Sequence, residues 1–370
     1  MFLSTFAIMN SEYVLNPLGY PIIVAEDSYE TLAKMLKLDA ESGSSFFILV
    51  DENTHYNCLP QLITNIEALI SAEIIEIDSG EENKNLETCI QLWETLTELG
   101  ADRHSVLINL GGGVITDMGG FVAATYKRGI RFYNIPTTLL AQVDASTGSK
   151  TGVDLGGLKN QVGVFADPQA VFINPCFLRT LPMEQIQSGF GEIIKHALIA
   201  DKAYWRLSKR KFCFLVENWG KLIKPSLEIK SSIVIKDPTE KGLRKLLNFG
   251  HTIGHALETL ALENKRPLLH GQAVALGMLA EAWLSTKLTG LSEDEFNEIQ
   301  KVILSNFDVY QFDETNFERI LELMGHDKKN VSGQVRLTLL NQIGKGVYDI
   351  SCEEKLLREA LKYLVALNDE

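Results

Sequence analysis

The chain has 370 residues, of which 45% are hydrophobic and 22% are charged, and its formal net charge is −13. These proportions are typical of a folded globular protein and exclude a disordered or collagen-like chain. Because one domain usually takes roughly 100–200 residues, we expect two domains. The acidic charge disfavours nucleic acid or a membrane surface as a partner, since both require basic surface. No apolar run reaches the roughly 18 residues that a membrane-spanning helix needs.

The N-terminal segment and the cysteines indicate a cytoplasmic protein. The segment MFLSTFAIMNSEYV lacks the basic start and the small-residue cleavage site of a secretory signal. The 5 cysteines are scattered along the chain without a C-x-x-C pair. We therefore expect free thiols in a reducing compartment.

Up to about residue 180, short β-branched runs alternate with amphipathic helical patterns. Strands are predicted at residues 21–24, 46–50, 73–77, 105–110, 131–135 and 170–174, and a helix at 86–99. Such alternation is typical of a largely parallel sheet that is covered on both faces. Ligands of these sheets bind beyond the carboxyl ends of the strands. Asp51 and the glycines that follow Leu110 fall at such ends.

The sequence SVLINLGGGVITD predicts a strand, a glycine turn and a helix. Gly111, Gly112 and Gly113 would let the backbone come close to a ligand. We expect Asp117 to cap the helix, whose first amides would then face a pyrophosphate group. The spacing differs from G-x-G-x-x-G, so a tight turn without a ligand is the alternative.

Residues 136–165 are rich in Gly, Ser and Thr and also carry Asp144, Lys150, Lys159 and Asn160. We expect a long loop here, and long loops inside compact domains are usually functional. Two lysines among small residues suit a phosphate or a polyhydroxylated substrate. Solvated lysines on an ordinary surface loop are the alternative.

After residue 181 the pattern becomes almost wholly helical, with apolar positions three or four apart at residues 186–199, 251–260, 273–287 and 352–367. There are no repeats and no flexible linker. We therefore predict an α/β domain over residues 1–180 and an all-α domain over residues 181–370.

The helical half carries a candidate metal site. His251 and His255 are one helical turn apart on one face, and His270 begins another predicted helix. Glu192 and Lys195 share a face of a third helix. Two histidines and one carboxylate with an open position form a catalytic zinc site. Structural histidines are the alternative, and the spacing alone does not decide which side chains are ligands.

Taken together, these segments resemble the 3-dehydroquinate synthases of the sugar-phosphate cyclase family. The resemblance runs from about residue 47 to residue 346 and is carried by GGGVITD, PTTLLAQVD, GSKTG with LKN, SGFGEIIK, RKLLNFGHTIGHALE, HGQAVALGM and DKK. It implies a Rossmann-like N-terminal domain, a helical C-terminal domain, NAD, Zn²⁺ (with Co²⁺ as an alternative) and a homodimer. The implied activity is a lyase of the shikimate pathway. It converts 3-deoxy-D-arabino-heptulosonate 7-phosphate to 3-dehydroquinate and phosphate by transient oxidation, elimination, re-reduction and an intramolecular aldol.

The resemblance also assigns roles to individual residues. Glu192, His251 and His270 match the metal ligands, and His255 becomes an active-site group beside the metal and a candidate proton shuttle. The positions that match NAD contacts are Asp51, Glu81, Lys84, Gly113, Val114, Asp117, Thr137, Thr138, Lys159, Phe177 and Thr180. Those that match catalytic and substrate contacts are Asp144, Lys150, Asn160, Lys195, Lys230, Arg244, Asn248, His255 and one of Lys328 and Lys329. Arg128 matches an arginine that reaches across the dimer to the substrate phosphate.

The chain departs from the common family pattern at several positions. Thr116 and Ser149 replace glycines, VDLGGLKN replaces VNHPLGKN, and Pro238 and Gln272 replace glutamates. None of these changes removes an implied metal ligand, whereas the groups around the ligands are altered.

Other functions remain as alternatives. A sister cyclase, such as a 2-deoxy-scyllo-inosose or 2-epi-5-epi-valiolone synthase, would use the same chemistry. Arg244 and Asn248 disfavour it, because these positions would hold a substrate carboxylate that a hexose phosphate lacks. An NAD- and metal-dependent polyol dehydrogenase would not need so many cations, and a non-catalytic binding protein would not need the catalytic set.

Overall fold

The computed structural model describes residues 8–9, 12–26, 28–156, 158–210, 219–325 and 335–367. The chain forms two compact units, Met1–Pro182 and Met183–Glu370. Within the described residues, no helix combines the length and the apolar character needed to span a membrane.

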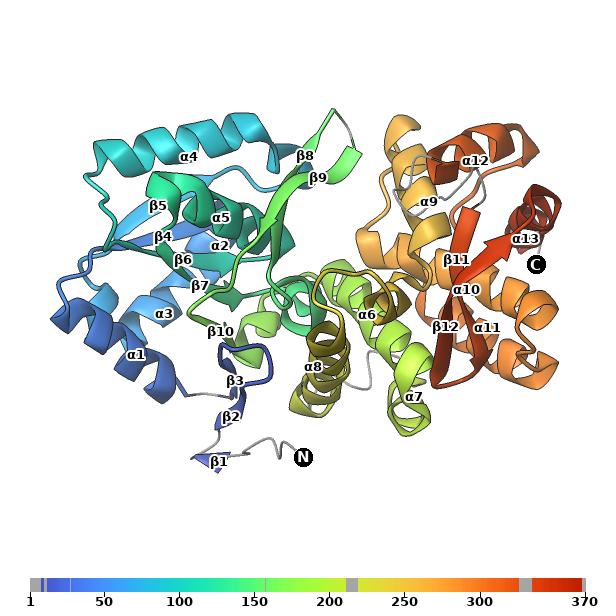
Figure 1. The fold of residues 1–370 in the computed structure, drawn as a ribbon, viewed down its shortest axis with the longest axis horizontal. Helices are drawn as coiled ribbons and strands as arrows, with labels where there is room; N and C mark the ends of the chain where they lie inside the picture. The colour runs from blue at the N-terminus through green and yellow to red at the C-terminus, as the bar shows by residue number, and fades with distance from the viewer. Residues whose placement is uncertain are drawn as a thin grey trace. The chain divides into compact units, whose positions relative to one another are not determined.

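The first unit is built on an eight-stranded sheet in the order β1-β2-β3-β10-β7-β6-β4-β5 (Figure 1). The strands from β3 to β5 in this order run parallel, and β1 and β2 form an antiparallel edge. Their bounds are β1 (Ile8–Met9), β2 (Glu12–Leu15), β3 (Ile22–Ala25), β4 (Phe46–Asp51), β5 (Glu73–Ile77), β6 (Val106–Gly111), β7 (Arg131–Pro136) and β10 (Ala170–Ile173).

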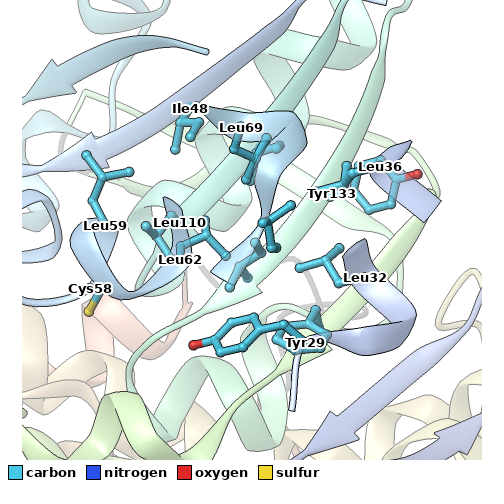
Figure 2. Close-up of a cluster of buried hydrophobic side chains, with 14 of the residues drawn as sticks. Tyr29, Leu32, Leu36, Ile48, Cys58, Leu59, Leu62, Leu69, Leu110 and Tyr133 are labelled. Carbon is cyan, nitrogen blue, oxygen red and sulfur yellow. The ribbon is translucent and has the colours of Figure 1, made fainter. Parts of the chain in front are cut away.

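Helices cover both faces of this sheet, because the strands are apolar on both sides. The helices are α1 (Glu30–Glu41), α2 (Glu52–Asn57), α3 (Leu59–Asn65), α4 (Leu86–Glu98) and α5 (Gly113–Thr125). Ile48 of β4 packs into one core with Leu32 and Leu36 of α1 and with Leu62 of α3 (Figure 2). The next residue, Leu49, packs into a second core with α4 and α5. Alternate side chains of one strand therefore reach opposite faces.

The neighbouring strands β4 and β6 connect to strands on opposite sides, because β4 leads to β5 and β6 leads to β7. Strand β4 lies between β5 and β6, and the chain visits β5 before it returns to β6. In open α/β sheets, ligands bind outside the carboxyl ends of the strands at such a point. Asp51 ends β4, and Gly112 follows β6.

The segment expected to be one long loop is more ordered than predicted. It contains a π-helical turn, η4 (Ala141–Ala145), and an antiparallel hairpin of β8 (Lys150–Leu155) and β9 (Leu158–Phe165). Gly152 pairs with Gly163, and a Cβ on Gly152 would lie only 2.5 Å from the carbonyl oxygen of Val162. Small residues let the two strands approach closely, and the loop prediction was wrong because the same residues weaken the strand pattern.

The second unit is mainly helical, which confirms the predicted fold class. Its helices are α6 (Met183–Ala200), α7 (Lys202–Ser208), α8 (Trp219–Lys236), α9 (His251–Glu263), α10 (His270–Leu288), α11 (Glu293–Asn306), α12 (Phe317–Gly325) and α13 (Glu354–Ala366). It is not entirely helical, because β11 (Val335–Gln342) and β12 (Lys345–Cys352) form a hairpin that the sequence reading missed. Leu339 and Leu340 of β11 are fully buried, so the hairpin belongs to the core of this unit.

Helix α10 crosses α6 and α9 at very short range, because glycines occupy the crossing points. A Cβ on Gly191 of α6 would lie 2.7 Å from the carbonyl oxygen of Gly271 in α10. A Cβ on Gly271 would overlap the carbonyl of Ser188, and one on Gly277 would overlap that of Gly250. These positions tolerate no side chain without separation of the helix backbones.

We expect Gly271→Ala to lower the free energy of unfolding by about 1–3 kcal/mol, because the added methyl group forces α6 and α10 apart. Chemical denaturation measures this change. Gly325→Ala is the matched control, since a Cβ at Gly325 meets nothing within 4 Å. Equal stability of the two variants would contradict the close crossing.

Candidate active site

With one exception, the residues predicted to bind a dinucleotide lie at or after the carboxyl ends of parallel strands in the first unit. Asp51 ends β4, Glu81 and Lys84 follow β5, Gly113, Val114 and Asp117 follow β6, Thr137 and Thr138 follow β7, and Phe177 and Thr180 follow β10. Lys159 lies apart from this set, on strand β9. Because the strands are parallel, their carboxyl ends meet at one edge of the sheet.

The glycine turn after β6 leads directly into α5. Gly112 is the N-cap residue, and no side chain of the described residues caps this helix end. The first amides of α5 therefore offer an anion-binding end, as in dinucleotide sites. Asp117 does not cap the helix, so that prediction was wrong. It lies inside α5, where its carboxylate forms an ion pair with Lys84 at 2.7 Å.

Two other residues that are predicted to contact the nucleotide also stabilise the fold. The carboxylate of Asp51 accepts a hydrogen bond from the Thr54 backbone N–H at 2.8 Å and caps α2. The Phe177 side chain is only 2% exposed and packs in the core beside α1 and α3. The Phe177 side chain is therefore part of the core and not available to a ligand.

Lys84 is buried among polar partners. Its Nζ donates to Asp117 Oδ2 at 2.7 Å and to Asn160 Oδ1 at 2.8 Å. Burial alone would lower the pKa of Lys84, but the negative charges of Asp117 and Glu81 outweigh it and raise the pKa above its ordinary value. The ammonium group stays charged in the interior because both partners stabilise it.

The predicted substrate residues of the first unit lie on short elements around α5. Asp144 is half-buried in η4, and Lys150 is exposed at the start of β8. Asn160 lies on β9 with a φ of 53°, and Arg128 follows α5 with a φ of 70°. The predicted residues Lys328 and Lys329 lie outside the described part of the chain.

In the second unit, three predicted metal ligands converge from three helices. Glu192 of α6 is fully buried, and apart from its ion pair with Lys195 its carboxylate oxygens have no hydrogen-bond partner within the described residues. The Nε2 atoms of His251 and His270 lie 3.7 and 3.6 Å from Glu192 Oε1. Tetrahedral zinc with bonds of about 2.0–2.1 Å separates two ligand atoms by about 3.4 Å. The three side chains therefore fit around a divalent cation.

Both histidines are oriented through their other ring nitrogen. The backbone oxygen of Phe249 lies 3.1 Å from His251 Nδ1, and Glu258 Oε2 lies 3.4 Å from His270 Nδ1. Such partners favour a proton on Nδ1 and leave Nε2 as the ligand atom. Desolvation opposes the charged ring of His270, but Glu192 and Glu258 outweigh it and raise its pKa to about 9.

His255 belongs to the same cluster, as its spacing from His251 predicts. Its ring centroid lies 5.1 Å from that of His251 and 5.6 Å from that of His270. The three histidines place ligand atoms within 4.8 Å of one another. The described geometry therefore accommodates His255 either beside a metal or as a ligand of it.

Buried cations accompany this cluster in the second unit. Lys195 is 1% exposed and forms an ion pair with Glu192, while Lys230 and Arg244 are also buried. The Arg244 guanidinium donates to the Pro238 carbonyl oxygen at 2.7 Å. The predicted Asn248 donates from Nδ2 to Glu240 Oε1 at 2.7 Å. Protein groups therefore hold Lys195, Arg244 and Asn248 in place.

Sequence reasoning missed the acidic residues that organise this region. Glu258 contacts His270, Glu240 accepts from Asn248, and Asp237 accepts three backbone N–H groups. Buried Glu281 of α10 accepts from the Gly250 N–H at 2.6 Å and fixes the start of α9. Spacing along the chain does not reveal these contacts: Glu258 lies three residues after His255 in α9, but it contacts His270 of α10.

The comparisons with known proteins agree over most of the chain. A family model described as 3-dehydroquinate synthase N-terminal matches residues 74–188, and the C-terminal model matches residues 189–330. The 3-dehydroquinate synthase of Parabacteroides distasonis is 45% identical over 320 residues, which cover 86% of this chain and 90% of that protein.

Solved structures share the fold over nearly the whole chain. A 2-epi-5-epi-valiolone synthase from Streptomyces hygroscopicus with NAD⁺ and Zn²⁺ bound has a TM-score of 0.83 at 25% identity and covers 99% of this chain and 100% of its own. A 2-deoxy-scyllo-inosose synthase in complex with carbaglucose-6-phosphate, NAD⁺ and Co²⁺ has a TM-score of 0.81 at 22% identity and covers 95% of this chain and 99% of its own.

The sheet topology and the helical unit define a dehydroquinate synthase-like fold. Both halves of the chain are matched by models of one family, and the identity to the P. distasonis protein extends along most of the sequence. The chain belongs to the 3-dehydroquinate synthase family.

We expect Glu258→Gln to weaken Zn²⁺ binding by about 10–100-fold, because a neutral amide orients His270 less firmly and makes its ring less basic. Competition with a chromogenic chelator measures the affinity. Glu263→Gln is the matched control, since Glu263 lies on the same helix but is exposed and pairs with Arg319. Unchanged affinity in Glu258→Gln would exclude its role behind His270.

We expect Asp237→Asn to destabilise the protein in a pH-dependent way. Burial raises the pKa of Asp237, but N–H groups of Lys241, Gly242 and Arg244 outweigh it and hold the pKa below its ordinary value. Its stabilisation is therefore present above the unfolded-state pKa of about 3.9 and is lost as the pH falls through the lower folded-state pKa.

At pH 7 the variant should lose about 1–3 kcal/mol of unfolding free energy, and the difference should shrink below about pH 4. Denaturation at several pH values measures this profile. Asp308→Asn, at an exposed position, is the control. A loss of equal size at pH 7 and pH 3 would show that the ionised carboxylate is not responsible.

Proposed function

We propose that this protein is a cytoplasmic 3-dehydroquinate synthase. As a carbon–oxygen lyase it would convert 3-deoxy-D-arabino-heptulosonate 7-phosphate to 3-dehydroquinate and phosphate. Family membership supports this activity. The single observation that carries it is the buried Glu192 carboxylate with two imidazole Nε2 atoms 3.6–3.7 Å away and the Lys195 ammonium beside it.

We further propose that the enzyme uses NAD and a divalent cation, Zn²⁺ or Co²⁺. The family relationship and the NAD⁺ and metal ions bound in the related cyclase structures support this. Glu192, His251 and His270 would hold the cation, and the strand ends of the first unit would hold the nucleotide. When bound, NAD supplies a transient hydride acceptor, and the cation lowers the pKa of a coordinated substrate hydroxyl.

The side chains of the protein would bind the substrate and move protons. Lys230, Arg244 and Asn248 would neutralise and orient the substrate carboxylate, and Lys150, Asn160 and Arg128 would bind its phosphate. His255 would shuttle a proton to and from the reacting hydroxyls, since an imidazole titrates near neutral pH. The leaving phosphate would serve as the base in the elimination. The hydride is returned, so the reaction shows no net redox change.

The cations of the second unit favour this activity over its rivals. A polyol substrate carries no anionic group, so a dehydrogenase has no use for three buried cations at Lys195, Lys230 and Arg244. A hexose phosphate lacks the carboxylate that Arg244 and Asn248 would bind. The arguments against a polyol and against a hexose phosphate both favour an acidic sugar phosphate as the substrate.

We also propose a homodimer, in which Arg128 would reach the substrate phosphate of the partner subunit. Arg128 is exposed in the turn after α5, so its guanidinium is accessible to a second subunit. The buried free thiols of Cys58, Cys89, Cys176 and Cys352 are consistent with a reducing compartment.

A phosphate-release assay with 3-deoxy-D-arabino-heptulosonate 7-phosphate tests the activity. We expect release that requires NAD and a divalent metal and that stops after chelation, without accumulation of NADH. Coupling to dehydroquinase identifies the product. Glu192→Gln should lose bound zinc and activity together while it keeps its circular dichroism spectrum. Phosphate release from glucose 6-phosphate or sedoheptulose 7-phosphate alone would instead identify a sister cyclase, and NADH accumulation with a polyol would identify a dehydrogenase.

A further inference from the structure

Lys84 lies where three elements of the first unit meet. It follows β5 and is 3% exposed, so its charge is withdrawn from solvent. Its Nζ reaches Asp117 on α5 and Asn160 on β9, 33 and 76 residues along the chain. One buried ammonium therefore joins the glycine-turn helix to the hairpin.

The backbone around Lys84 strengthens the same connection. The Asp154 N–H donates to the Lys84 carbonyl oxygen at 2.9 Å. Asp154 Oδ1 in turn accepts from the Asn160 N–H at 2.6 Å and holds Asn160 at its positive φ. Lys159 adds an ion pair with Glu81 at 3.3 Å. Residues 81–84 therefore contact the end of the hairpin through both side-chain and backbone bonds.

The hairpin depends on such links for its orientation. Strands β8 and β9 pair only with each other among the described strands and do not join the main sheet. The rest of the hairpin packs on α5, where Thr151 lies against Gly120. A two-stranded hairpin has little stability by itself, so its direction is set by the groups that anchor it.

We propose that Lys84 is a positioning residue that couples nucleotide binding to the orientation of the substrate-binding hairpin. This inference rests on the proposed function, in which Asp117 contacts NAD and Asn160 contacts the substrate. A ligand that changes the position of Asp117 changes the field and geometry around Lys84, and Lys84 transmits that change to Asn160. Coupling of this kind is reciprocal, so the hairpin also alters the affinity for NAD.

The proposal gives Lys84 a different role from a direct nucleotide contact. Its ammonium already donates to two protein oxygens at 2.7 and 2.8 Å, which directs it into the protein. Loss of a direct contact would weaken NAD binding alone. Loss of a coupling residue would leave NAD able to bind but would uncouple the hairpin from it.

Hydrogen–deuterium exchange of the full-length protein, with and without saturating NAD and in the absence of substrate, tests the coupling. In the wild-type protein, NAD should slow amide exchange in residues 150–165. In Lys84→Met, which keeps the length of the side chain without its charge, exchange there should be faster and should not respond to saturating NAD. The substrate KM of this variant should rise by about 5–150-fold, the usual range of coupling between sites.

Asn160→Ala provides a second test in case Lys84→Met does not fold, because it removes the side-chain hydrogen bond from Lys84 but leaves Lys84 paired with Asp117. We expect NAD to bind Asn160→Ala without protection of the hairpin. Lys34→Met is the control, since Lys34 forms an exposed ion pair with Glu30 in α1 and should behave as wild type.

Each outcome of these experiments supports or contradicts the coupling between NAD binding and the hairpin. A hairpin that responds to NAD equally in wild type, Lys84→Met and Asn160→Ala overturns the coupling. Weaker NAD binding with unchanged hairpin exchange shows a nucleotide contact only and also overturns it. If the wild-type protein binds NAD and protects the hairpin but releases no phosphate, the proposed function is contradicted and the coupling stands. Wild-type protein that binds no NAD overturns both.

Discussion

The short-range crossing of α6, α9 and α10 is the constraint on which the second unit depends. Packed helix axes usually lie 8–10 Å apart. The side chains of Glu192, His251 and His270 meet within a few ångströms, so the three helices that carry them must approach one another closely. Each of these three residues is next to a glycine, and those glycines form the crossing points. The glycines that let the helix backbones approach closely therefore also bring the three candidate ligands together.

Buried charge imposes the next constraint, and both units meet it in the same way. A charge without a partner in the interior costs several kcal/mol, so each buried ionic group must be paired or hydrogen-bonded. Lys195 pairs with Glu192 in the second unit, and Lys84 pairs with Asp117 in the first. Because an ionic partner is effective only at short range, the Lys84–Asp117 pair also fixes α5 against the segment that follows β5, whereas Glu192 and Lys195 lie one turn apart on α6. Groups that would bind ligands thus also hold the fold in one arrangement.

The sequence predicted the parts of the structure that depend on local pattern. All six strands proposed for the first half are present, because β-branched runs bounded by turn residues are a local signal. The hairpins at 150–165 and 335–352 were missed, since small polar residues or short amphipathic strands weaken that signal. The residue pattern indicated Glu192, His251, His255 and His270 as candidates for a metal site, whereas only the resemblance selected Glu192, His251 and His270 as the ligands. The roles of Asp237, Glu240 and Glu281 depend on contacts that chain position does not reveal.

Several departures from the family pattern have local explanations that leave the candidate sites intact. Ser149 has a φ of 62°, a conformation that favours the glycine usual at that position, and its hydroxyl bonds to Asp167. The backbone oxygen of Pro238 still accepts from Arg244, so loss of the usual glutamate does not leave that guanidinium without an acceptor. Gln272 accepts from the Leu269 N–H at 3.1 Å and keeps the cap of α10, which begins at His270. A backbone carbonyl or a neutral amide can replace a carboxylate where the task is to accept a hydrogen bond. It cannot do so where the task is to balance charge, and the pairs of Glu192 with Lys195 and of Asp117 with Lys84 each join an acidic to a basic side chain.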